Sequence, residues 1–436
     1  MTLVLGEWLV TAGASDPQHN SGVRVTDGII DATGTNDELR ARFPEDDIVD
    51  AANHVVMPGF VNAHVHLYGV LAHGIPVDDA PDGFWSFLDD YWWPKVEDAL
   101  DHDMIAAATD WVCAEMLRSG TTTFFDILEA PQALPNALLV EKEIVEKRGI
   151  RGLLSFEATE RAGVDIAELG LAENVQLIEA CRDSDLVSGL MSFHTTFTCS
   201  REYIERAFGL AADLGVLTHA HCNEGLHEGA WCEENVGMRT LEYYEKLGVA
   251  GPGFLASQCV QLSDREQQII AETGIRVSHM PLANCEVGGG IAPIPELIAA
   301  GVTVGLGSDG YINDFFEVMR GSFLLHKARL LDPGTMPAST VFSLATEGGA
   351  AALGLERIGR LDVGWAADLQ VVDATFPTPT TAHNLIEQLV LWRNHTHVRD
   401  VMVGGDWRVR NRDVLGADLD RMQAATHEQA RRLWSS

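Results

Sequence analysis

Eight short apolar runs, separated by amphipathic stretches, constrain the fold of this chain more than any other feature. The runs are residues 54–64, 121–127, 151–157, 188–194, 215–221, 254–260, 274–280 and 301–309. Helical periodicity fills the intervals, as in ALDHDMIAAATDWVCAEMLRSG at 99–120 and SDREQQIIAETG at 263–274. Alternating strands and helices are typical of βα units, and eight such units are the number needed for a closed (β/α)8 TIM barrel. The sequence therefore predicts an α/β fold of this kind.

The two ends of the chain differ from this pattern. Residues 1–52 and the segment from 359 onward contain short strands and turns, and the tail from about 417 is helical and rich in charge. We expect both ends to form one small β-sandwich-like domain, with residues 1–52 as its N-terminal part. Residues 359–436 would supply its C-terminal part and a terminal helix, and residues 53–358 would form the barrel.

An aromatic segment interrupts the first βα unit. Residues 67–100 are too long for a simple connection and contain Phe84, Trp85, Trp92 and Trp93. Loops at the carboxyl ends of barrel strands surround the active site in this fold. Trp85 and Trp92 are therefore candidate substrate contacts, and ordinary packing within a loop is the alternative.

Charge restricts the possible partners. The net charge is −34, from 64 acidic and 30 basic residues, and lysine occurs at only five positions. Repulsion disfavours binding to nucleic acid or to anionic membranes. We expect a cytoplasmic protein, since no signal-peptide pattern or long apolar run is present. Such an acidic, lysine-poor surface favours adaptation to concentrated salt, and an acidic enzyme of a low-salt cell is the alternative.

Histidines stand where several of these strands end. His64 and His66 are two residues apart, so that on one strand both side chains point to the same side. The HxH pattern alone is weak, because it recurs at His219 with His221 and again at 395–397. The pair at 395–397 lies near the C-terminal strands and is predicted to be a surface turn.

The later strands supply further metal-binding donors. His221 ends the fifth run, Glu224 follows three residues later, and Glu228 lies one helical turn beyond. Asp309 closes the eighth run after two glycines. Together with His64 and His66, His221 and Asp309 would bring three imidazoles and a carboxylate to one end of the barrel. Such donors suit zinc, with iron or manganese as alternatives. The seven cysteines are odd in number and form no CxxC pair, which disfavours a thiolate site.

Three segments resemble a known family. PGFVNAHVHL, THAHCNEGLHE and GVTVGLGSDGYIND are similar to the amidohydrolase superfamily, in the branch of cytosine and guanine deaminases, adenosylhomocysteine deaminases and triazine hydrolases. The resemblance extends over essentially the whole chain. WWPKVEDAL and SFEATERAG look closest to aminohydrolases linked by name to selenium metabolism.

The resemblance implies roles for these residues. His64, His66, His221 and Asp309 would bind one divalent metal ion, and Glu224 would be the acid and base above it. The run at 188–194 lacks the lysine that bridges two metals in other members of the superfamily, which favours a single ion. Glu228 and His279 are candidate substrate contacts. A packing or hydrogen-bonding role is favoured over metal ligation for both His194 and His279.

One position departs from the family pattern. The stretch ASQCVQL has Gln258 where relatives usually carry a histidine. Glutamine donates and accepts hydrogen bonds but cannot titrate. We therefore expect Gln258 to orient the substrate, with a packing residue on the sixth strand as the alternative, while Asp309 and Glu224 transfer protons.

The predicted activity is hydrolysis of a non-peptide C–N bond in a small molecule, by deamination of a nitrogen heterocycle or cyclic amidine. Water activated by the metal would attack an sp2 carbon, and Glu224 would protonate the leaving nitrogen. Ring opening of a cyclic amide is one alternative, and a metal-binding homologue without deaminase activity is another. We expect a homodimer.

The charge balance predicts that stability rises with salt. Ions screen repulsion between surface carboxylates over about 10 Å at 0.1 M and about 3 Å at 1 M. The melting temperature should therefore increase between dilute and molar KCl. A melting temperature that stays flat or falls over this range would contradict adaptation to salt.

Overall fold

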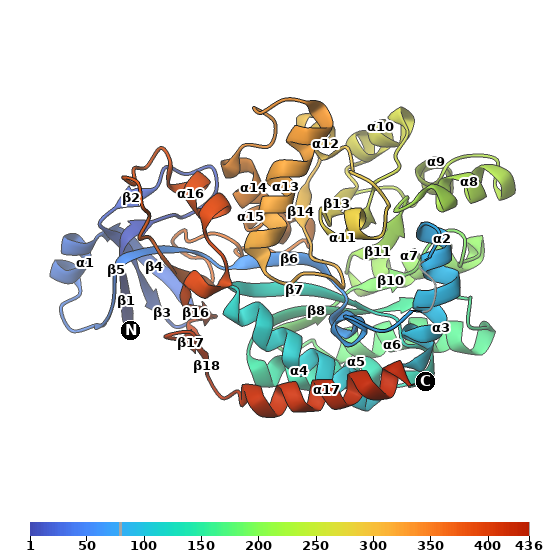
Figure 1. Ribbon diagram of the computed structural model, residues 1–436, viewed down its shortest axis with the longest axis horizontal. Helices are drawn as coiled ribbons and strands as arrows, with labels where there is room; N and C mark the ends of the chain where they lie inside the picture. The colour runs from blue at the N-terminus through green and yellow to red at the C-terminus, as the bar shows by residue number, and fades with distance from the viewer. Residues whose placement is uncertain (78–80, 436) are drawn as a thin grey trace.

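The computed structural model describes residues 1–77 and 81–435 and contains a parallel barrel with a second sheet beside it (Figure 1). The barrel strands are β6 (Phe60–Val65), β7 (Thr121–Leu128), β8 (Arg151–Ala158), β10 (Met191–Phe193), β11 (Thr218–Cys222), β12 (Phe254–Gln258), β13 (Arg276–His279) and β14 (Val304–Leu306). They pair in this order, all in parallel, and β9 (Val187–Gly189) adds to β8. The predicted (β/α)8 fold is confirmed.

The last strand meets the first at the carboxyl end of the barrel. The backbone amides of Ser308 and Asp309 both donate to the carbonyl of His64, each at 3.0 Å. Ser278 Oγ also donates to the carbonyl of Ala63 at 3.0 Å. These bonds bring the first strand, with its histidines, against the loop that carries Asp309.

The first predicted barrel strand, 54–64, divides at Gly59. Residues up to Pro58 belong to β5 (Asp47–Pro58) in the second sheet, whereas β6 begins at Phe60 in the barrel. A Cβ atom on Gly59 would lie 2.2 Å from the Thr122 side chain, so a glycine is needed where the chain passes between the sheets. The sequence pattern missed this division because both halves are equally apolar.

Both ends of the chain build the second sheet, as predicted. Its strands in order are β18 (Asp413–Val414), β17 (Asp406–Arg410), β16 (Val398–Val403), β15 (Leu369–Asp373), β5, β1 (Thr2–Leu9), β3 (Ser21–Thr26) and β4 (Ile29–Thr35), with β2 (Gln18–His19) paired to β1. Only β1 and β5 run parallel. Since β5 leads directly into β6, this sheet is anchored at the start of the barrel.

Helices cover the barrel (Figure 1). The longer ones are α4 (His102–Arg118), α5 (Ala137–Arg148), α6 (Val164–Ala180), α7 (Arg201–Leu214), α8 (Leu226–Asn235), α9 (Thr240–Leu247), α10 (Asp264–Thr273), α13 (Phe315–Leu330), α16 (Leu385–Trp392) and α17 (Leu419–Trp434). The shorter ones are α1 (Asn36–Arg42), α11 (Ala283–Glu286), α12 (Ile294–Ala299), α14 (Ala338–Leu344), α15 (Glu347–Ala352), η4 (Pro131–Ala133) and η5 (His395–His397). None of the helices within the described residues is long and apolar enough to cross a membrane.

The terminal helix α17 lies along α4, on the outside of the barrel (Figure 1). Trp434 Nε1 donates to the carbonyl of Leu71 at 2.8 Å. Leu71 belongs to η1 (Leu67–Ala72), which follows β6 directly. Trp434 of α17 therefore holds η1, the segment that follows His64 and His66, in place.

The aromatic segment forms a series of short helices. After η1 come α2 (Phe84–Ser86), η2 (Phe87–Trp92), α3 (Trp93–Lys95) and η3 (Glu97–Ala99). Phe87 and Trp92 stack with ring centroids 5.4 Å apart. Trp93 is buried, and the guanidinium of Arg161 lies 4.9 Å from its ring centroid. Its described residues, 67–77 and 81–100, thus form a packed structure rather than an extended loop.

We predict that Asp368→Ala destabilises the protein more than a surface substitution. Asp368 is 2% exposed, and it accepts hydrogen bonds from Arg151 of β8 at 3.1 Å and from the backbone of Gly404 at 2.6 Å. Its removal leaves the Arg151 guanidinium without its carboxylate and the Gly404 amide without an acceptor, which costs up to about 3 kcal/mol in free energy of unfolding.

Chemical denaturation at fixed KCl measures this loss. Asp362→Ala is the matched control, because Asp362 and its partner Arg360 have side chains 37% and 35% exposed, and such pairs contribute about 0–1 kcal/mol. Equal losses in the two variants would contradict the role assigned to Asp368.

Candidate active site

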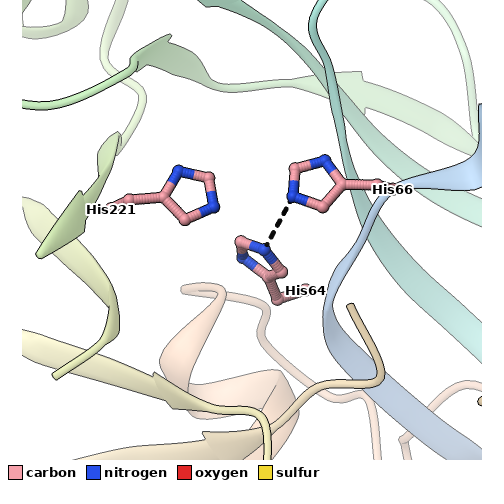
Figure 2. A group of neighbouring side chains, drawn as sticks. All are labelled: His64, His66 and His221. Carbon is pink, nitrogen blue, oxygen red and sulfur yellow. Dashed lines mark hydrogen bonds between the residues drawn. The ribbon is translucent and has the colours of Figure 1, made fainter. Parts of the chain in front are cut away.

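Three histidines meet at the carboxyl end of the barrel. His64 and His66 come from β6 and its end, and His221 comes from β11, and their ring nitrogens face one another (Figure 2). His64 Nε2 and His66 Nε2 are 3.3 Å apart, and one nitrogen of each of the three rings lies within 4.8 Å of the others. The structure thus brings together the three imidazoles that the sequence placed on the first and fifth strands.

The other nitrogen of each ring is already bonded. His64 Nδ1 lies 2.8 Å from Ser257 Oγ, His66 Nδ1 lies 2.6 Å from the carbonyl of Ile127, and His221 Nδ1 lies 2.5 Å from Glu157 Oε1. A carbonyl or carboxylate partner fixes the tautomer of a histidine and leaves its Nε2 lone pair free to bind a metal. His66 and His221 have such partners, and Ser257 holds the third ring.

Asp309 adds a carboxylate to the group. Its Oδ1 lies 3.7 Å from His66 Nε2 and its Oδ2 lies 3.9 Å from His64 Nε2. The residue has φ of +61°, in the left-handed region, and the amide of Gly310 donates to Oδ1 at 2.7 Å. This turn directs the carboxylate to the histidines and not away from the barrel.

Gln258 also contacts Asp309. Its Nε2 donates to Asp309 Oδ2 at 2.7 Å, and its buried Oε1 has no hydrogen-bond partner among the described residues. Gln258 and Cys259 have φ of +70° and +51°. Such conformations cost free energy in residues other than glycine and are concentrated at functional sites. The end of β12 is therefore bent so that this amide reaches the histidine group.

The second HxH motif divides into two roles. His221 faces the site, whereas His219 uses both ring nitrogens behind it, at 2.8 Å from Ser192 Oγ and 2.5 Å from Ser257 Oγ. Ser257 in turn contacts His64. Sequence reasoning missed Ser257, Glu157 and the supporting role of His219. Of these, Glu157 carried a signal, because it ends the third apolar run just as the metal-binding candidates end theirs.

These donors fit a divalent metal ion. Three imidazole nitrogens and one carboxylate are a donor set that zinc, iron and manganese all accept. The imidazoles of His64, His66 and His221 are buried, and Asp309 is largely so. Buried charge of this kind normally needs a partner. A cation between the rings would satisfy the carboxylate and the three free lone pairs together.

Neighbouring charges shift the pKa values of the site. Burial opposes the charged form of His221, but the carboxylate of Glu157 outweighs it and raises the pKa of His221 to about 9, so a metal ion that binds at Nε2 must displace a proton from it. For Glu224, burial and then the negative charge of Asp309 raise the pKa to about 8. Glu224 can therefore carry a proton near neutral pH, which a general acid requires.

A cavity of about 460 Å³ opens above the histidines. Its polar lining includes His66, His194, His221, Glu97, Glu157, Glu224, Gln258, Glu286 and Asp309. Its aromatic lining consists of Phe84, Phe87, Tyr91 and Trp92 from the aromatic segment, with Tyr311 from the loop after β14. The predicted contact Trp92 thus lies in the wall, and the aromatic segment covers this end of the barrel.

Three other predicted contacts lie elsewhere in the described structure. Trp85 stacks on His227 with ring centroids 3.8 Å apart and is not in the cavity wall. Glu228 is buried and bonds to the Thr196 hydroxyl at 2.7 Å. His279 pairs with the ring of His326 at 3.1 Å. The structure therefore does not bring these three side chains into the main cavity.

A buried ionic cluster lies beneath one side of the cavity. Tyr68 Oη donates to Glu97 at 2.8 Å, and Arg161 contacts Glu97, Asp98 and Glu129. Burial, opposed by the charge of Arg161, raises the pKa of Glu129 to about 7. Arg161 is the cation that offsets this group of carboxylates.

Comparison with known proteins agrees with this geometry. The model of the amidohydrolase family matches residues 55–408. The chain is 34% identical to a 5-methylthioadenosine/S-adenosylhomocysteine deaminase of Syntrophobacter fumaroxidans, over 94% of this chain and 92% of that enzyme. It is 30% identical to a 5'-deoxyadenosine deaminase of Methanopyrus kandleri, over 94% of both chains.

A solved structure gives the same result. An adenosine deaminase from Xanthomonas campestris, crystallised with bound zinc, superposes with a TM-score of 0.91 at 28% identity, over 100% of this chain and 99% of that one. Fold and site define a metal-dependent barrel hydrolase. The chain belongs to the amidohydrolase family, and it is a hydrolase of C–N bonds other than peptide bonds.

We predict that Glu157→Gln weakens metal binding. In the parent protein the Glu157 carboxylate orients His221 and makes its free nitrogen more basic. The substitution removes that negative charge. Loss of such a partner typically lowers metal affinity by about 10–100-fold. Competition with a chromogenic chelator measures the affinity. Glu143→Gln, at an exposed position on α5, is the control. An affinity equal to that of this control would show that Glu157 does not support the metal site.

Proposed function

We propose that this enzyme deaminates a nitrogen heterocycle or cyclic amidine. The observation that carries the proposal is the arrangement of three free imidazole nitrogens, the Asp309 carboxylate and Glu224 around one cavity. The relatives named as deaminases of adenosine derivatives support the same chemistry.

In this proposal His64, His66, His221 and Asp309 hold a single divalent ion, with zinc as the metal. The zinc in the Xanthomonas campestris enzyme supports this choice. Two-metal members of the superfamily carry a bridging lysine on the fourth strand, and residues 187–193 contain none. When bound, the ion would lower the pKa of water toward about 7 and so supply a nucleophile at neutral pH.

The side chains of the chain then handle the protons. Asp309 accepts the proton of the attacking water, and Glu224 delivers protons to the substrate nitrogen and to the leaving amine. The raised pKa of Glu224, about 8, suits a group that must hold a proton before it donates one. Gln258 holds Asp309 through its Nε2 and orients the substrate through its free Oε1.

The remaining contacts are assigned by position. Trp92 forms part of the substrate wall. Glu228 acts indirectly in the proposal, because it accepts a hydrogen bond from the amide of Asn223, next to Glu224. For Trp85 and His279, contact with the substrate stays a prediction from the sequence.

We further propose that the enzyme is cytoplasmic, that it is adapted to concentrated salt and that it forms a homodimer. The net charge of −34 with five lysines supports the salt assignment. Sedimentation in dilute and molar KCl measures the oligomeric state under both conditions.

Ammonia release tests the activity. Metal-loaded enzyme is incubated with purine nucleosides, pyrimidines, aminotriazines and cyclic guanidines, and ammonia and metal content are both measured. Deamination releases one ammonia per substrate consumed. Substrate consumption without ammonia would indicate ring opening instead, and binding without any turnover would indicate a homologue that has lost catalysis.

We predict that Glu224→Gln retains the metal and loses most of the turnover. Glutamine has nearly the same shape but cannot donate and then accept a proton. A general acid–base group typically contributes about 10²–10⁴-fold in rate. Metal analysis and kcat measured on the same preparation separate the two effects. Activity within a few-fold of the parent would remove Glu224 from the mechanism.

A further inference from the structure

The cavity wall is rich in carboxylates, which accept hydrogen bonds and carry negative charge. Five of its described residues are carboxylic acids, namely Glu97, Glu157, Glu224, Glu286 and Asp309. No lysine or arginine occurs among the described residues that line it. The only basic side chains in that lining are histidines. Such a wall favours a ligand that brings hydrogen-bond donors and positive charge.

Most of these acids already have partners. Glu97 is bonded to Tyr68 and Arg161, Glu157 to His221, and Asp309 to Gln258 and the amide of Gly310. Glu224 is the proposed proton donor. Glu286, at the end of α11, differs from the others, because no hydrogen bond or ion pair of its carboxylate is found in the described structure.

The surroundings of Glu286 place it inside the electrostatic field of the site. Partial burial and then the negative charge of Asp309 raise its pKa, whereas His73 lowers it. Partial burial and the charge of Glu286 also raise the pKa of Tyr91, a residue of the aromatic wall. Glu286 is exposed to solvent and lines the same cavity as Asp309 and Tyr91, so its charge acts on both residues.

Gln258 gives a second, independent sign of a donor-bearing ligand. Its side chain is fully buried, lines the cavity, and leaves Oε1 without a partner in the described structure. A buried acceptor without a donor costs free energy, so buried polar groups are nearly always paired. The amide nitrogen of Gln258 donates to Asp309, so the amide oxygen is left to accept a hydrogen bond from a ligand.

The aromatic wall completes the recognition surface. Phe87, Tyr91 and Trp92 form a group of neighbouring rings along η2, and all three line the cavity. The faces of such rings attract planar cations, most strongly where water is excluded. Aromatic rings and an unpaired carboxylate in the wall of one cavity suit a flat, positively charged group.

We propose that the substrate is a planar cation whose nitrogens all carry hydrogens, that is, an amidinium or guanidinium group within or attached to a heterocycle. Glu286 and the aromatic wall bind the positively charged group. Gln258 Oε1 accepts a hydrogen bond from one of its N–H groups, near the reacting carbon. This inference rests on the proposed deaminase function and narrows its substrate class.

The reaction balances for such a substrate. Water oxygen forms a bond to the amidinium carbon, and the bond from that carbon to one amino nitrogen breaks. Both protons of the water end on the departing nitrogen. An amidinium ion and water thus give a neutral amide and an ammonium ion, and a guanidinium ion gives a urea in the same way. Charge is conserved and no oxidant or further reactant is needed.

The test compares two flat probes of nearly the same shape, benzamidinium and neutral benzamide, by calorimetric titration of the metal-loaded enzyme at fixed KCl concentration. We expect benzamidinium to bind at least about tenfold more tightly, since hydrogen bonds to charged groups are about twice as strong as neutral ones. Glu286→Gln should lower benzamidinium affinity about tenfold or more and leave benzamide affinity unchanged. Glu234→Gln, at an exposed position on α8 outside the cavity, changes the net charge equally and should alter neither.

The outcomes separate this inference from the proposed function. Equal binding of the two probes, or equal losses in Glu286→Gln and Glu234→Gln, would overturn the cationic substrate class. Ammonia release from neutral nucleosides, unaffected by Glu286→Gln and more efficient than from cyclic guanidines, would also overturn it while leaving deamination intact. Selective binding of benzamidinium that Glu286→Gln removes supports the inference through a measurement that does not depend on turnover.

Discussion

The hydrogen bonds that join the last barrel strand to the first determine what this molecule can do. The amides of Ser308 and Asp309 donate to the carbonyl of His64, so that one metal-ligand candidate is fixed directly to another. Residues 245 positions apart in the chain become neighbours because parallel strands end at the same edge of the barrel. If this junction were displaced, the carboxylate would no longer face the imidazoles, whatever the quality of the remaining packing.

A second group of contacts turns this proximity into a site. The imidazoles of His64, His66 and His221 are each held through Nδ1 by a hydroxyl, a carbonyl and a carboxylate, respectively. These contacts come from β12, β7 and β8, so three further strands of the barrel take part in orienting the rings. The free nitrogen of each ring points inward because the other is occupied.

Negative charge acts at two scales in this protein. On the surface, 64 acidic residues against 30 basic ones give a net charge of −34, which concentrated ions can screen. For the buried carboxylates of the cavity such screening is weak, and each of them needs a specific partner or a proton. Glu97 has Arg161 and Tyr68, Glu224 has a raised pKa, and Glu286, which is exposed to solvent, has no hydrogen bond or ion pair among the described residues. Because Glu286 has no hydrogen bond or ion pair with the described residues, it is the acid that we propose binds a positively charged ligand.

The sequence alone determined the barrel and the group of His64, His66, His221 and Asp309, because strand periodicity and position at a strand end are local properties. It also indicated that Gln258 is unusual. The sequence did not indicate the division of the first strand at Gly59, since the end of β5 and the whole of β6 form one continuous apolar run and only their partners differ. The fold alone decided that Glu157 and Ser257 hold the histidines, that Trp85 and His279 lie outside the cavity, and that Glu286 faces it without a partner. Each of these depends on contacts between segments far apart in the chain, and a side chain's partner is fixed only when the strands and loops around it are packed.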